Sequence, residues 1–525
     1  MNPAKREQKK AAGLLQKGER RIAAALRIAF VVVLLLLQVA SVMLLSYILK
    51  QRGAIIYGGL RIAGLAGAIA IYNRRGNTMY KFTWIMLILT APVAGMILYL
   101  LWSGKMQSRR LVRAAQRRAE EPESVRMRDE LNADKLAHAI PTWARVMNSL
   151  RRRGFSVYRD TKVTYYPEGK LFLEDLLAHC EKAERFIFLE YFILAEGKLW
   201  NRLFDILREK AAAGVEVKII FDDFGNIKRF RGETIEKMRE AGIEVFIFNP
   251  VHRYVNRLYF NYRDHRKLAC IDGVLGYTGG VNFADEYANI ITRFGYWKDS
   301  GIRLEGEGSW GLTKSFMDML AFLSGSTRHE ADYYRPHTDV RSEGWCQPFT
   351  DGPRNNPDNP ALDTYLQLIA NAKRFLYLTT PYFIPDEKIL HALCVAGDGG
   401  VDVRLMLPAI PDHRYTDLVA DSFIGELLEH GVKVYRFTPG FLHQKCVMVD
   451  REIAVVGSVN MDYRSFELHY ECGVVLYGCP MIEDLLEDMD GIVEKSHLLT
   501  PEEWQGRKWP RRAVEPLLRL FAIWM

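Results

Sequence analysis

The chain has 525 residues, a formal net charge of +8 at pH 7 and 49% hydrophobic residues, so it is long enough for more than one domain with its own core. Its seven cysteines are an odd number and show no paired spacing of the kind that binds a metal. These features exclude a small disulfide-stapled fold and a cysteine-based metal centre. They predict reduced, buried thiols.

Residues 28–103 carry the pattern of a membrane region. A basic tail over 1–27 precedes an apolar run over 28–49 that is long enough to span a bilayer. A second run of this kind covers 82–102. A cleaved signal peptide is not expected, because the first run is too long and a second follows it. The alternative, two buried core helices of a soluble domain, does not explain uncharged runs of this length.

The middle of this region is harder to assign. The segment 54–72 is apolar but glycine-rich and carries Arg61, so it fits a third span, a re-entrant segment or an interfacial one. In the second run, Pro92 and Gly95 are the expected kink points.

Lysines and arginines flank the membrane region on both sides, in the tail 1–27 and in the basic helical linker 104–160. By the positive-inside rule both flanks lie in the cytoplasm, which requires an even number of spans. Arg74, Arg75 and Lys81 do not fit, because a two-span arrangement leaves them outside. We nevertheless expect two full spans and the rest of the chain in the cytoplasm.

Beyond the linker the sequence is internally duplicated. The matching segments are 183–189 with 372–378, 214–220 with 400–406, and 242–245 with 431–434. Short apolar, β-branched runs alternate with helical stretches in each half, which predicts an α/β fold with a mostly parallel or mixed sheet covered by helices. The period is too long for a solenoid, so we expect two related domains, over 161–340 and 341–495.

Each half contains one copy of the same motif of histidine, lysine and aspartate. The copies are His265, Lys267 and Asp272, followed by Asn282, and His443, Lys445 and Asp450, followed by Asn460. The spacings are identical, and two matching copies are unlikely to arise by chance. In an extended strand, residues i and i+2 point the same way, so each copy places an imidazole beside an ammonium group. That pair suits a phosphate, and glycines before each asparagine allow the backbone to approach it.

The motifs and their tails resemble those of the phospholipase D superfamily, over roughly residues 161–495. The surrounding segments 261–267, 190–192 and 460–465, together with the hydrophobic N-terminal region, are similar to bacterial cardiolipin synthases. The resemblance implies two pseudo-symmetric phospholipase D-like domains with the active site at their interface.

The resemblance also implies roles for individual residues. His265 would be the nucleophile and His443 the acid/base, although the symmetry of the sequence leaves the reverse open. Lys267 and Lys445 would neutralise the phosphate.

Four carboxylates complete the expected site. By the superfamily pattern, Asp299 would orient His265 and Glu471 would orient His443. Asp272 and Asp450 belong to the motifs, and they either take part in catalysis or hold turns.

The expected reaction is the transfer of a phosphatidyl group through a phosphohistidine. One phosphatidylglycerol loses glycerol, and the headgroup hydroxyl of a second then attacks to give cardiolipin, without a metal, nucleotide or other cofactor. The alternatives are a hydrolase of the phospholipase D type or a phosphatidyltransferase with another acceptor. A non-enzymatic membrane scaffold and a nuclease are weaker options.

The positive charge and the membrane region together favour an anionic membrane surface as partner, rather than nucleic acid. The expected location is the inner membrane, with several spans and a cytoplasmic catalytic region. In the tail 496–525, arginines stand beside apolar residues, which predicts an interfacial helix. A helix docked on the domain is the alternative.

Overall fold

The computed structural model describes residues 51–74, 78–102, 123–227, 229–230, 232–250, 262–325, 331–353, 359–519 and 522. They fall into two compact units, one built from the helices of residues 51–102 and one from most of the described residues after 123. The second unit holds both copies of the histidine motif.

The first half of the large unit contains a seven-stranded sheet with the order β1-β9-β7-β6-β2-β3-β4. Its strands are β1 (Thr161–Tyr166), β2 (Phe186–Tyr191), β3 (Glu216–Asp222), β4 (Glu244–Phe248), β6 (Lys267–Ile271), β7 (Leu275–Gly279) and β9 (Gly301–Gly306). β2, β3 and β4 are parallel, and the other pairs are antiparallel. The apolar runs of the sequence form the central strands, because strands covered on both faces need nearly continuous hydrophobic residues.

The second half repeats this order in the path β10-β19-β17-β16-β11-β13-β14, which β20 extends. Its strands are β10 (Trp345–Asp351), β11 (Phe375–Thr379), β13 (Asp402–Pro408), β14 (Lys433–Phe437), β16 (Cys446–Val449), β17 (Ile453–Gly457), β19 (His469–Tyr477) and β20 (Ser496–Leu498). Matched position by position, the two sheets have the same order. The prediction of two related α/β domains is therefore confirmed.

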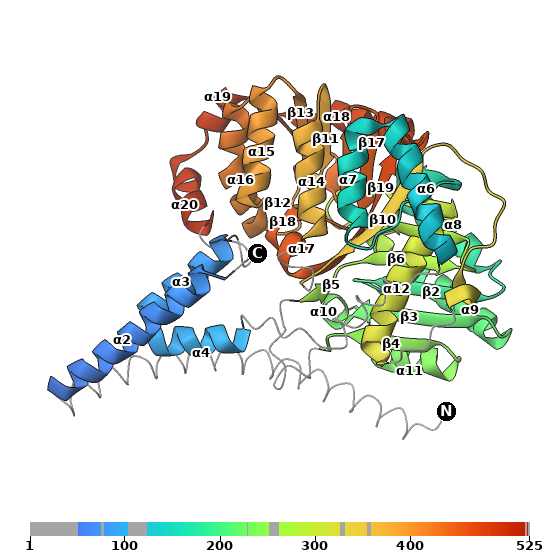
Figure 1. Ribbon diagram of the computed structural model, residues 1–525, viewed down its shortest axis with the longest axis horizontal. Coiled ribbons are helices and arrows are strands. Elements are labelled where there is room, and N and C mark those ends of the chain that lie inside the picture. Colours follow the sequence, from blue (N-terminus) through green and yellow to red (C-terminus); the bar gives the residue numbers. More distant parts are fainter. Residues whose placement is uncertain are drawn as a thin grey trace. The chain divides into compact units, whose positions relative to one another are not determined.

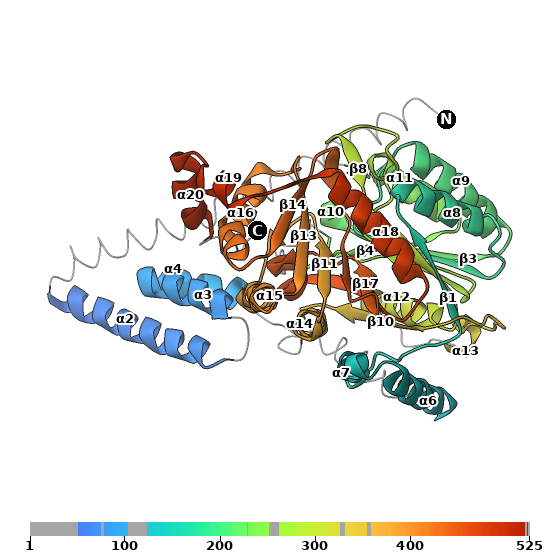
Figure 2. The same cartoon turned by 90° about the horizontal axis from the view of Figure 1, so that it is seen from above.

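Helices cover the outer faces of both sheets, and the inner faces share a core. The outer helices include α8 (Gly169–Cys180), α9 (Lys198–Ala212), α11 (Gly232–Glu240), α14 (Pro360–Asn371), α15 (Glu387–Asp398) and α16 (Arg414–Glu429). Figure 1 shows α14, α15 and α16 side by side over the second sheet. The inner helices are α12 (Ser309–Ser324) and α18 (Met481–Glu494), whose apolar side chains form one cluster with strands of both halves (Figure 2).

Short strands connect the halves in two places. β5 (Arg263–Asp264), from the first half, pairs in parallel with the start of β19 in the second. β8 (Tyr296–Lys298), also from the first half, pairs in parallel with β15 (Gly440–Leu442). The remaining short elements are α10 (Asp223–Asn226), α13 (Ala331–Tyr334), α17 (Tyr463–Glu467), β12 (Phe383–Ile384), β18 (Met461–Asp462) and the 3-10 helices Pro141–Trp143 and Asp285–Ala288.

The described part of the linker is helical and packs on the second half. It forms α6 (Glu123–Ala139) and α7 (Ala144–Arg151), and α7 lies against α14. The indole of Trp143 donates to Glu452, and Gln347 donates to the backbone oxygens of Met147 and Phe155. These bonds fix the linker to the domain.

The smaller unit consists of α2 (Gln51–Tyr72), α3 (Thr78–Thr90) and α4 (Pro92–Trp102), which pack on one another. The run 82–102 forms parts of two helices, because the chain breaks at Ala91, next to the expected kink point Pro92. Pro92 cannot donate a helical hydrogen bond and begins α4. α4 folds back on α3 so closely that a Cβ on Gly95 would stand 2.7 Å from the Leu87 oxygen.

Among the helices of the described ranges, none combines the length and apolarity needed to cross a membrane. The run 28–49 lies outside the described residues, so that span and the orientation stay predictions. The segment 54–72, left open between three arrangements, lies within the single helix α2.

The C-terminal tail forms α19 (Pro501–Gln505) and α20 (Trp509–Arg519), and α20 docks on α16. Its inner face carries Arg511, which contacts Asp421, and Arg519, whose guanidinium stands 4.2 Å from the Phe423 ring centre. Its outer face leaves Trp509 77% exposed. The docked alternative is confirmed on one face, and the interfacial role of the other stays a prediction.

Candidate active site

The two histidines meet at the junction of the halves because each follows a strand that pairs with the opposite half. His265 comes directly after β5, and its backbone N–H donates to the Tyr470 oxygen over 2.9 Å. His443 comes directly after β15, and its N–H donates to the Lys298 oxygen over 2.7 Å. Each histidine is thus fixed by a backbone bond across the interface.

The orienting carboxylates are also exchanged between the halves. His265 Nδ1 lies 2.9 Å from Glu471 Oε1, and His443 Nδ1 lies 2.6 Å from Asp299 Oδ2. The expected pairing of Asp299 with His265 and Glu471 with His443 is therefore wrong. The reason is geometric: the pairing of β5 with β19 and of β8 with β15 carries each carboxylate to the histidine of the other half.

These contacts prepare the imidazoles for chemistry at the opposite nitrogen. Each carboxylate accepts a hydrogen bond from Nδ1–H, which leaves Nε2 to attack phosphorus or to exchange a proton. Both rings are buried. Burial, and the positive charges of Lys267 and Lys445, hold the pKa of both histidines well below the usual range.

The two lysines form the positive part of the site. Lys267 Nζ donates to the His265 oxygen over 2.5 Å, and Lys445 Nζ donates to the His443 oxygen. Burial lowers the pKa of Lys267 to about 7 and that of Lys445 to about 8. An anion at the site would favour the charged ammonium, because opposite charges at close range stabilise each other. The expected pairing of histidine with lysine in each copy is present.

Asp272 and Asp450 hold turns, which is one of the two roles predicted for them. Both have positive φ, 54° and 55°, in the turn after β6 and β16. Each carboxylate accepts three backbone N–H bonds of 2.8–2.9 Å, from residues 184–186 and from residues 373–375. A strand of five residues puts them roughly 16 Å from the lysines. Their assignment as catalytic residues is wrong at that distance.

The two asparagines differ. Asn282 accepts from the Ile193 N–H over 3.0 Å and donates to the Tyr287 hydroxyl over 2.7 Å, which places the Tyr287 ring 5.3 Å from His443. Asn460 is buried, and its Oδ1 has no hydrogen-bond partner among the described residues. Asn282 therefore supports the wall around His443.

Comparison with known proteins identifies the family. A family model described as "Cardiolipin synthase, PLD-like domain" matches residues 176–290 and 365–493, and one described as "Phospholipase D-nuclease N-terminal" matches 62–104. A cardiolipin synthase of Halalkalibacterium halodurans is 33% identical over 465 residues, 86% of this chain and 90% of that protein. One of Alkalihalophilus pseudofirmus is 33% identical over 462 residues, 87% and 91% of the two chains.

The chain belongs to the phospholipase D-type cardiolipin synthases. Among solved structures, phosphatidylserine synthase of Haemophilus influenzae matches 70% of this chain and 94% of its own, with a TM-score of 0.55 and 15% identity. At that identity the match shows the fold alone, and it agrees with the two-domain arrangement.

In this synthase, sequence reasoning missed the groups that surround Glu471. The carboxylate accepts from the hydroxyls of Ser458 and Ser465 as well as from His265. The His469 ring lies beside that of His265, with ring centres 5.4 Å apart and planes tilted by 39°. His469 and Glu471 are two residues apart in one strand and so share a face, which is the signal that could have found His469.

His469 is held in a defined state. Arg464 Nε donates to its Nε2 over 3.1 Å, which leaves the proton on Nδ1, 3.8 Å from Glu471. Burial lowers the pKa of His469 to about 3, so the ring is neutral. The synthase therefore presents a third, neutral imidazole beside His265.

His443 has a different neighbourhood. The rings of Tyr287, Trp297 and Phe441 lie 5.3, 5.4 and 5.6 Å from it, and Lys445 Nζ lies 2.9 Å from its Nδ1. Its partner Asp299 accepts from the Ser300 N–H, and burial raises the pKa of Asp299 to about 7. Asp299 is therefore protonated more readily near neutral pH than an exposed carboxyl group is.

Ligand atoms of His265, His469 and Glu471 lie within 4.8 Å of one another, a spacing that a metal ion could use. The charges of Lys267 and Lys445, which lower the pKa of His265, oppose a cation at the same place. Glu471 also already accepts three hydrogen bonds. The donor set therefore fits a phosphate better than a metal.

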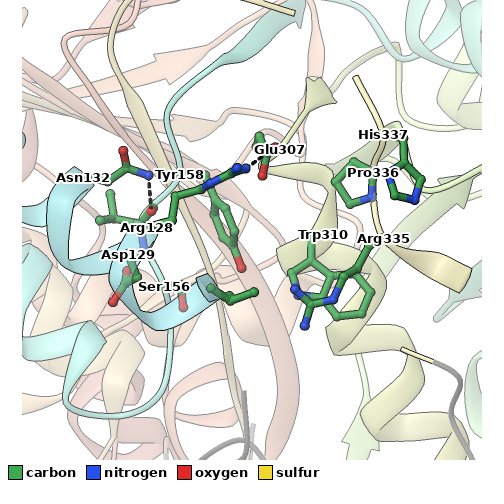
Figure 3. A pocket seen from close by; sticks show the side chains of 12 residues that line it. Arg128, Asp129, Asn132, Ser156, Tyr158, Glu307, Trp310, Arg335, Pro336 and His337 are labelled. Atoms are coloured by element: carbon green, nitrogen blue, oxygen red, sulfur yellow. Dashed lines mark hydrogen bonds and ion pairs between the residues drawn. The ribbon is translucent and has the colours of Figure 1, made fainter. Parts of the chain in front are cut away.

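A separate cavity of about 220 Å³ lies between α6, α12 and residues 335–337 (Figure 3). Three of its charged side chains are paired, Arg128 with Glu307 over 2.6 Å and Asp129 with Arg151 over 2.8 Å. Its lining contains neither motif, so it is not the catalytic centre.

Proposed function

We propose that the enzyme moves a phosphatidyl group from one phosphatidylglycerol to the headgroup hydroxyl of another and releases glycerol. The observation that carries the proposal is the crossed site, in which two imidazoles with fixed Nδ1 atoms and two ammonium groups meet at one interface. Membership of the cardiolipin synthase family supports the same reaction.

In the first step, Nε2 of His265 attacks phosphorus. The N–P bond forms as the P–O bond to glycerol breaks, and protonated His443 gives its proton to the departing oxygen. Lys267 and Lys445 balance the negative charge of the phosphoryl oxygens. In the second step, the hydroxyl of the acceptor lipid gives its proton to His443 and attacks phosphorus. The P–O bond to the acceptor then forms as the N–P bond breaks.

The division of roles between the histidines has support in their carboxylates. Glu471 accepts three hydrogen bonds, from His265 and from the hydroxyls of Ser458 and Ser465, which fix its carboxylate beside the ring that would carry the positive charge of a phosphoimidazole. Asp299, with a pKa of about 7, suits a histidine that gains and loses a proton in each turnover. This favours His265 as nucleophile and His443 as acid/base.

The charge of the substrate affects the protonation of His443. The lowered pKa of His443 leaves its ring neutral in the empty site, where it cannot act as an acid. A bound phosphodiester adds a negative charge and raises the pKa again. The acid form would therefore be populated when the donor lipid is bound.

The aromatic rings around His443 support transfer over hydrolysis. The acceptor must approach on the side of His443, because the second step reverses the path of the first. Tyr287, Trp297 and Phe441 make that side apolar, which opposes water at the phosphohistidine.

The membrane is part of the proposal. Both substrates are bilayer lipids, and the anionic surface suits a chain with a net charge of +8. We expect a multi-pass protein of the inner membrane, with the catalytic unit in the cytoplasm and the outer face of α20 at the interface. A cysteine in place of Gly104 should react with an impermeant thiol reagent only after that membrane is opened. Reaction in intact cells would reverse this orientation.

The overall reaction is tested with purified enzyme, phosphatidylglycerol alone and a chelator. Equal amounts of cardiolipin and glycerol are expected, and excess glycerol should reverse the reaction. Phosphatidic acid as the main product would favour the hydrolase, and a need for another acceptor lipid would favour a different transferase.

The histidine roles are tested with phosphatidyl-p-nitrophenol, whose leaving group departs without a proton. His443→Ala should release a burst of one nitrophenol per enzyme and then stop, with the phosphatidyl group on His265, found by peptide mass spectrometry at alkaline pH. Phosphatidylglycerol turnover by either His265→Ala or His443→Ala should fall by about 10⁴-fold or more. A burst in His265→Ala, with the adduct on His443, would reverse the assignment.

A further inference from the structure

Five large hydrophobic side chains are exposed on segments that connect to the catalytic residues. They are Phe224 (43% exposed), Ile290 (39%), Ile291 (50%), Ile410 (40%) and Tyr415 (51%). Single exposed apolar residues are ordinary, whereas a contiguous apolar edge marks a binding surface. These five residues form one surface if each of them is connected to the same site.

On the side of His265, one of them contacts a residue of the site directly and a second lies near it. The guanidinium of Arg263, two residues before His265, stands 5.2 Å from the centre of the Phe224 ring. Tyr415, in the first turn of α16, lies close enough to Arg464 to affect its electrostatics, and Arg464 donates to His469 beside His265.

On the side of His443, the connection runs through Trp297. The side chain of Asn289 donates to the Trp297 oxygen over 2.9 Å and accepts from its N–H over 2.8 Å. Ile290 and Ile291 lie within the loop that this pair closes. The Trp297 ring is 5.4 Å from His443, so both isoleucines sit on a loop anchored to the wall of the site.

Two of the five occupy equivalent positions of the duplication. Phe224 comes two residues after the end of β3, and Ile410 comes two residues after the end of β13. β3 and β13 hold the same place in their sheets, and the segments that lead into them match. Both halves thus expose a hydrophobic side chain at the strand end nearest the site, although nothing in the two cores requires it.

The charges beside these residues favour an anionic partner. Arg293, in the same loop as Ile291, and Arg414, next to Tyr415, are both exposed. Arg293 also pairs with Glu286 over 3.3 Å, and Glu286 is shared with Arg229. The nearby acids are occupied: Asp412 accepts from the Tyr382 hydroxyl, and Asp417 pairs with Arg436 over 2.9 Å. No ion pair of Arg414 occurs within the described ranges of the chain.

We propose that the apolar rim, defined as Phe224, Ile290, Ile291, Ile410 and Tyr415, seats the opening of the catalytic site on the surface of an anionic phospholipid bilayer. The inference deepens the proposed function and rests on it. Apolar side chains at acyl depth, with Arg293 and Arg414 at headgroup level, match the layering of such a surface. The phosphodiester could then reach the lysines while its acyl chains stay among lipid.

The rim is tested in the full chain by placing a reporter on it. All seven native cysteines are buried, so a cysteine introduced by Ile410→Cys is labelled selectively with an environment-sensitive fluorophore. Phosphatidylglycerol vesicles should shift its emission to the blue. The control is Val395→Cys, 55% exposed in the last turn of α15 and therefore before β13 rather than after it. Its emission should not change.

Kinetics give the second readout. The triple variant Phe224→Ser, Ile410→Ser and Tyr415→Ser should raise KM for vesicle phosphatidylglycerol about tenfold or more, because surface contact contributes to apparent affinity. Dihexanoyl-phosphatidylglycerol dispersed as monomers needs no surface, and its turnover should stay within about twofold of that of the unmodified enzyme. The matched variant Val395→Ser should be unchanged on both substrates.

Three results would overturn the proposal: equal emission shifts at Ile410 and Val395, an unchanged KM on vesicles in the triple variant, or a shift at Ile410 that needs no lipid and grows with protein concentration. The last would assign the rim to contact between two copies of the chain. If the unmodified enzyme turned over neither phosphatidylglycerol, the proposed function would fail. The fluorescence shift alone would then decide whether the rim meets a bilayer.

Discussion

The two halves share a strand order, a motif and a turn, yet their histidines have different surroundings. His265 faces a carboxylate with two further serine donors and a neutral third imidazole, His469. His443 faces Asp299, whose pKa is raised to about 7, and three aromatic rings. Because the scaffold is the same, the difference lies in residues outside the motifs. The duplicated halves have therefore kept the same fold, while the surroundings of their two histidines have diverged.

The largest expected effect comes from changing each carboxylate and timing the two steps of the reaction separately. With phosphatidyl-p-nitrophenol, Glu471→Gln should slow the burst roughly 10²–10³-fold, because His265 loses its orienting partner. Asp299→Asn should leave the burst nearly unchanged and slow the following steady phase by a similar factor. Stopped-flow absorbance measures both phases. A slowed burst in Asp299→Asn would mean that the step of attack also depends on the carboxylate that orients His443.

The two lysines should also differ in their effect on the pH dependence of the reaction. The pKa of Lys267 is lowered to about 7 and that of Lys445 to about 8, so each is charged below its pKa and neutral above it. Since a neutral amine does not balance a phosphate, kcat/KM should decline from about pH 7 upward, by roughly tenfold per unit above both values if one charge is essential. Lys267→Arg should move this decline to higher pH, because arginine keeps its proton. An unchanged profile in Lys267→Arg and Lys445→Arg would assign the decline to other groups.

We expect His469 to position Glu471 for the step at His265 and to have no part in the step at His443. His469→Leu should slow the burst about tenfold, because Glu471 then loses a nearby N–H. His469→Gln keeps an N–H group and should recover part of the rate. The steady phase and the melting temperature are the controls, and neither should change. Equal slowing of both phases would show that the ring supports packing rather than the step at His265.

The turn aspartates should show the smallest effect on activity, and it should be the same in both halves. Asp272→Ala and Asp450→Ala each remove a carboxylate with three backbone donors, which should cost about 1–3 kcal/mol of unfolding free energy. The kcat per folded molecule should stay within about twofold. Denaturant titration and active-site counting by the nitrophenol burst separate the two quantities. A loss of kcat at full folding would restore a catalytic role.

The sequence predicted the parts of the site that depend on local geometry. Strand alternation gave the pairing of His265 with Lys267, and the duplication gave two domains of one fold. The exchange of Asp299 and Glu471 could not be predicted, because it depends on β5, β8 and β15. These strands have only two or three residues, too few for a hydrophobic period, and their partners lie in the other half.

Other misses have equally physical causes. His469 lies outside the repeated motif, so counting motif residues overlooked it. The break at Ala91 depends on Pro92, which is a local signal in the sequence. It also depends on the close approach of α4 to α3 at Gly95, which is a tertiary contact and has no local signal. Asp272 and Asp450 were ambiguous because a motif shows that a position is used, not whether its side chain meets substrate or backbone.

The crossed carboxylates have a consequence for biosynthesis. His265 is 206 residues ahead of the glutamate that orients it. At a synthesis rate of about 5–20 residues per second, that separation corresponds to roughly 10–40 s during which the first half can fold on the ribosome. Throughout this interval His265 lacks its partner, so a chain that stalls or is truncated before Glu471 has an incomplete site. The site is therefore assembled only when synthesis of the second half has passed Glu471.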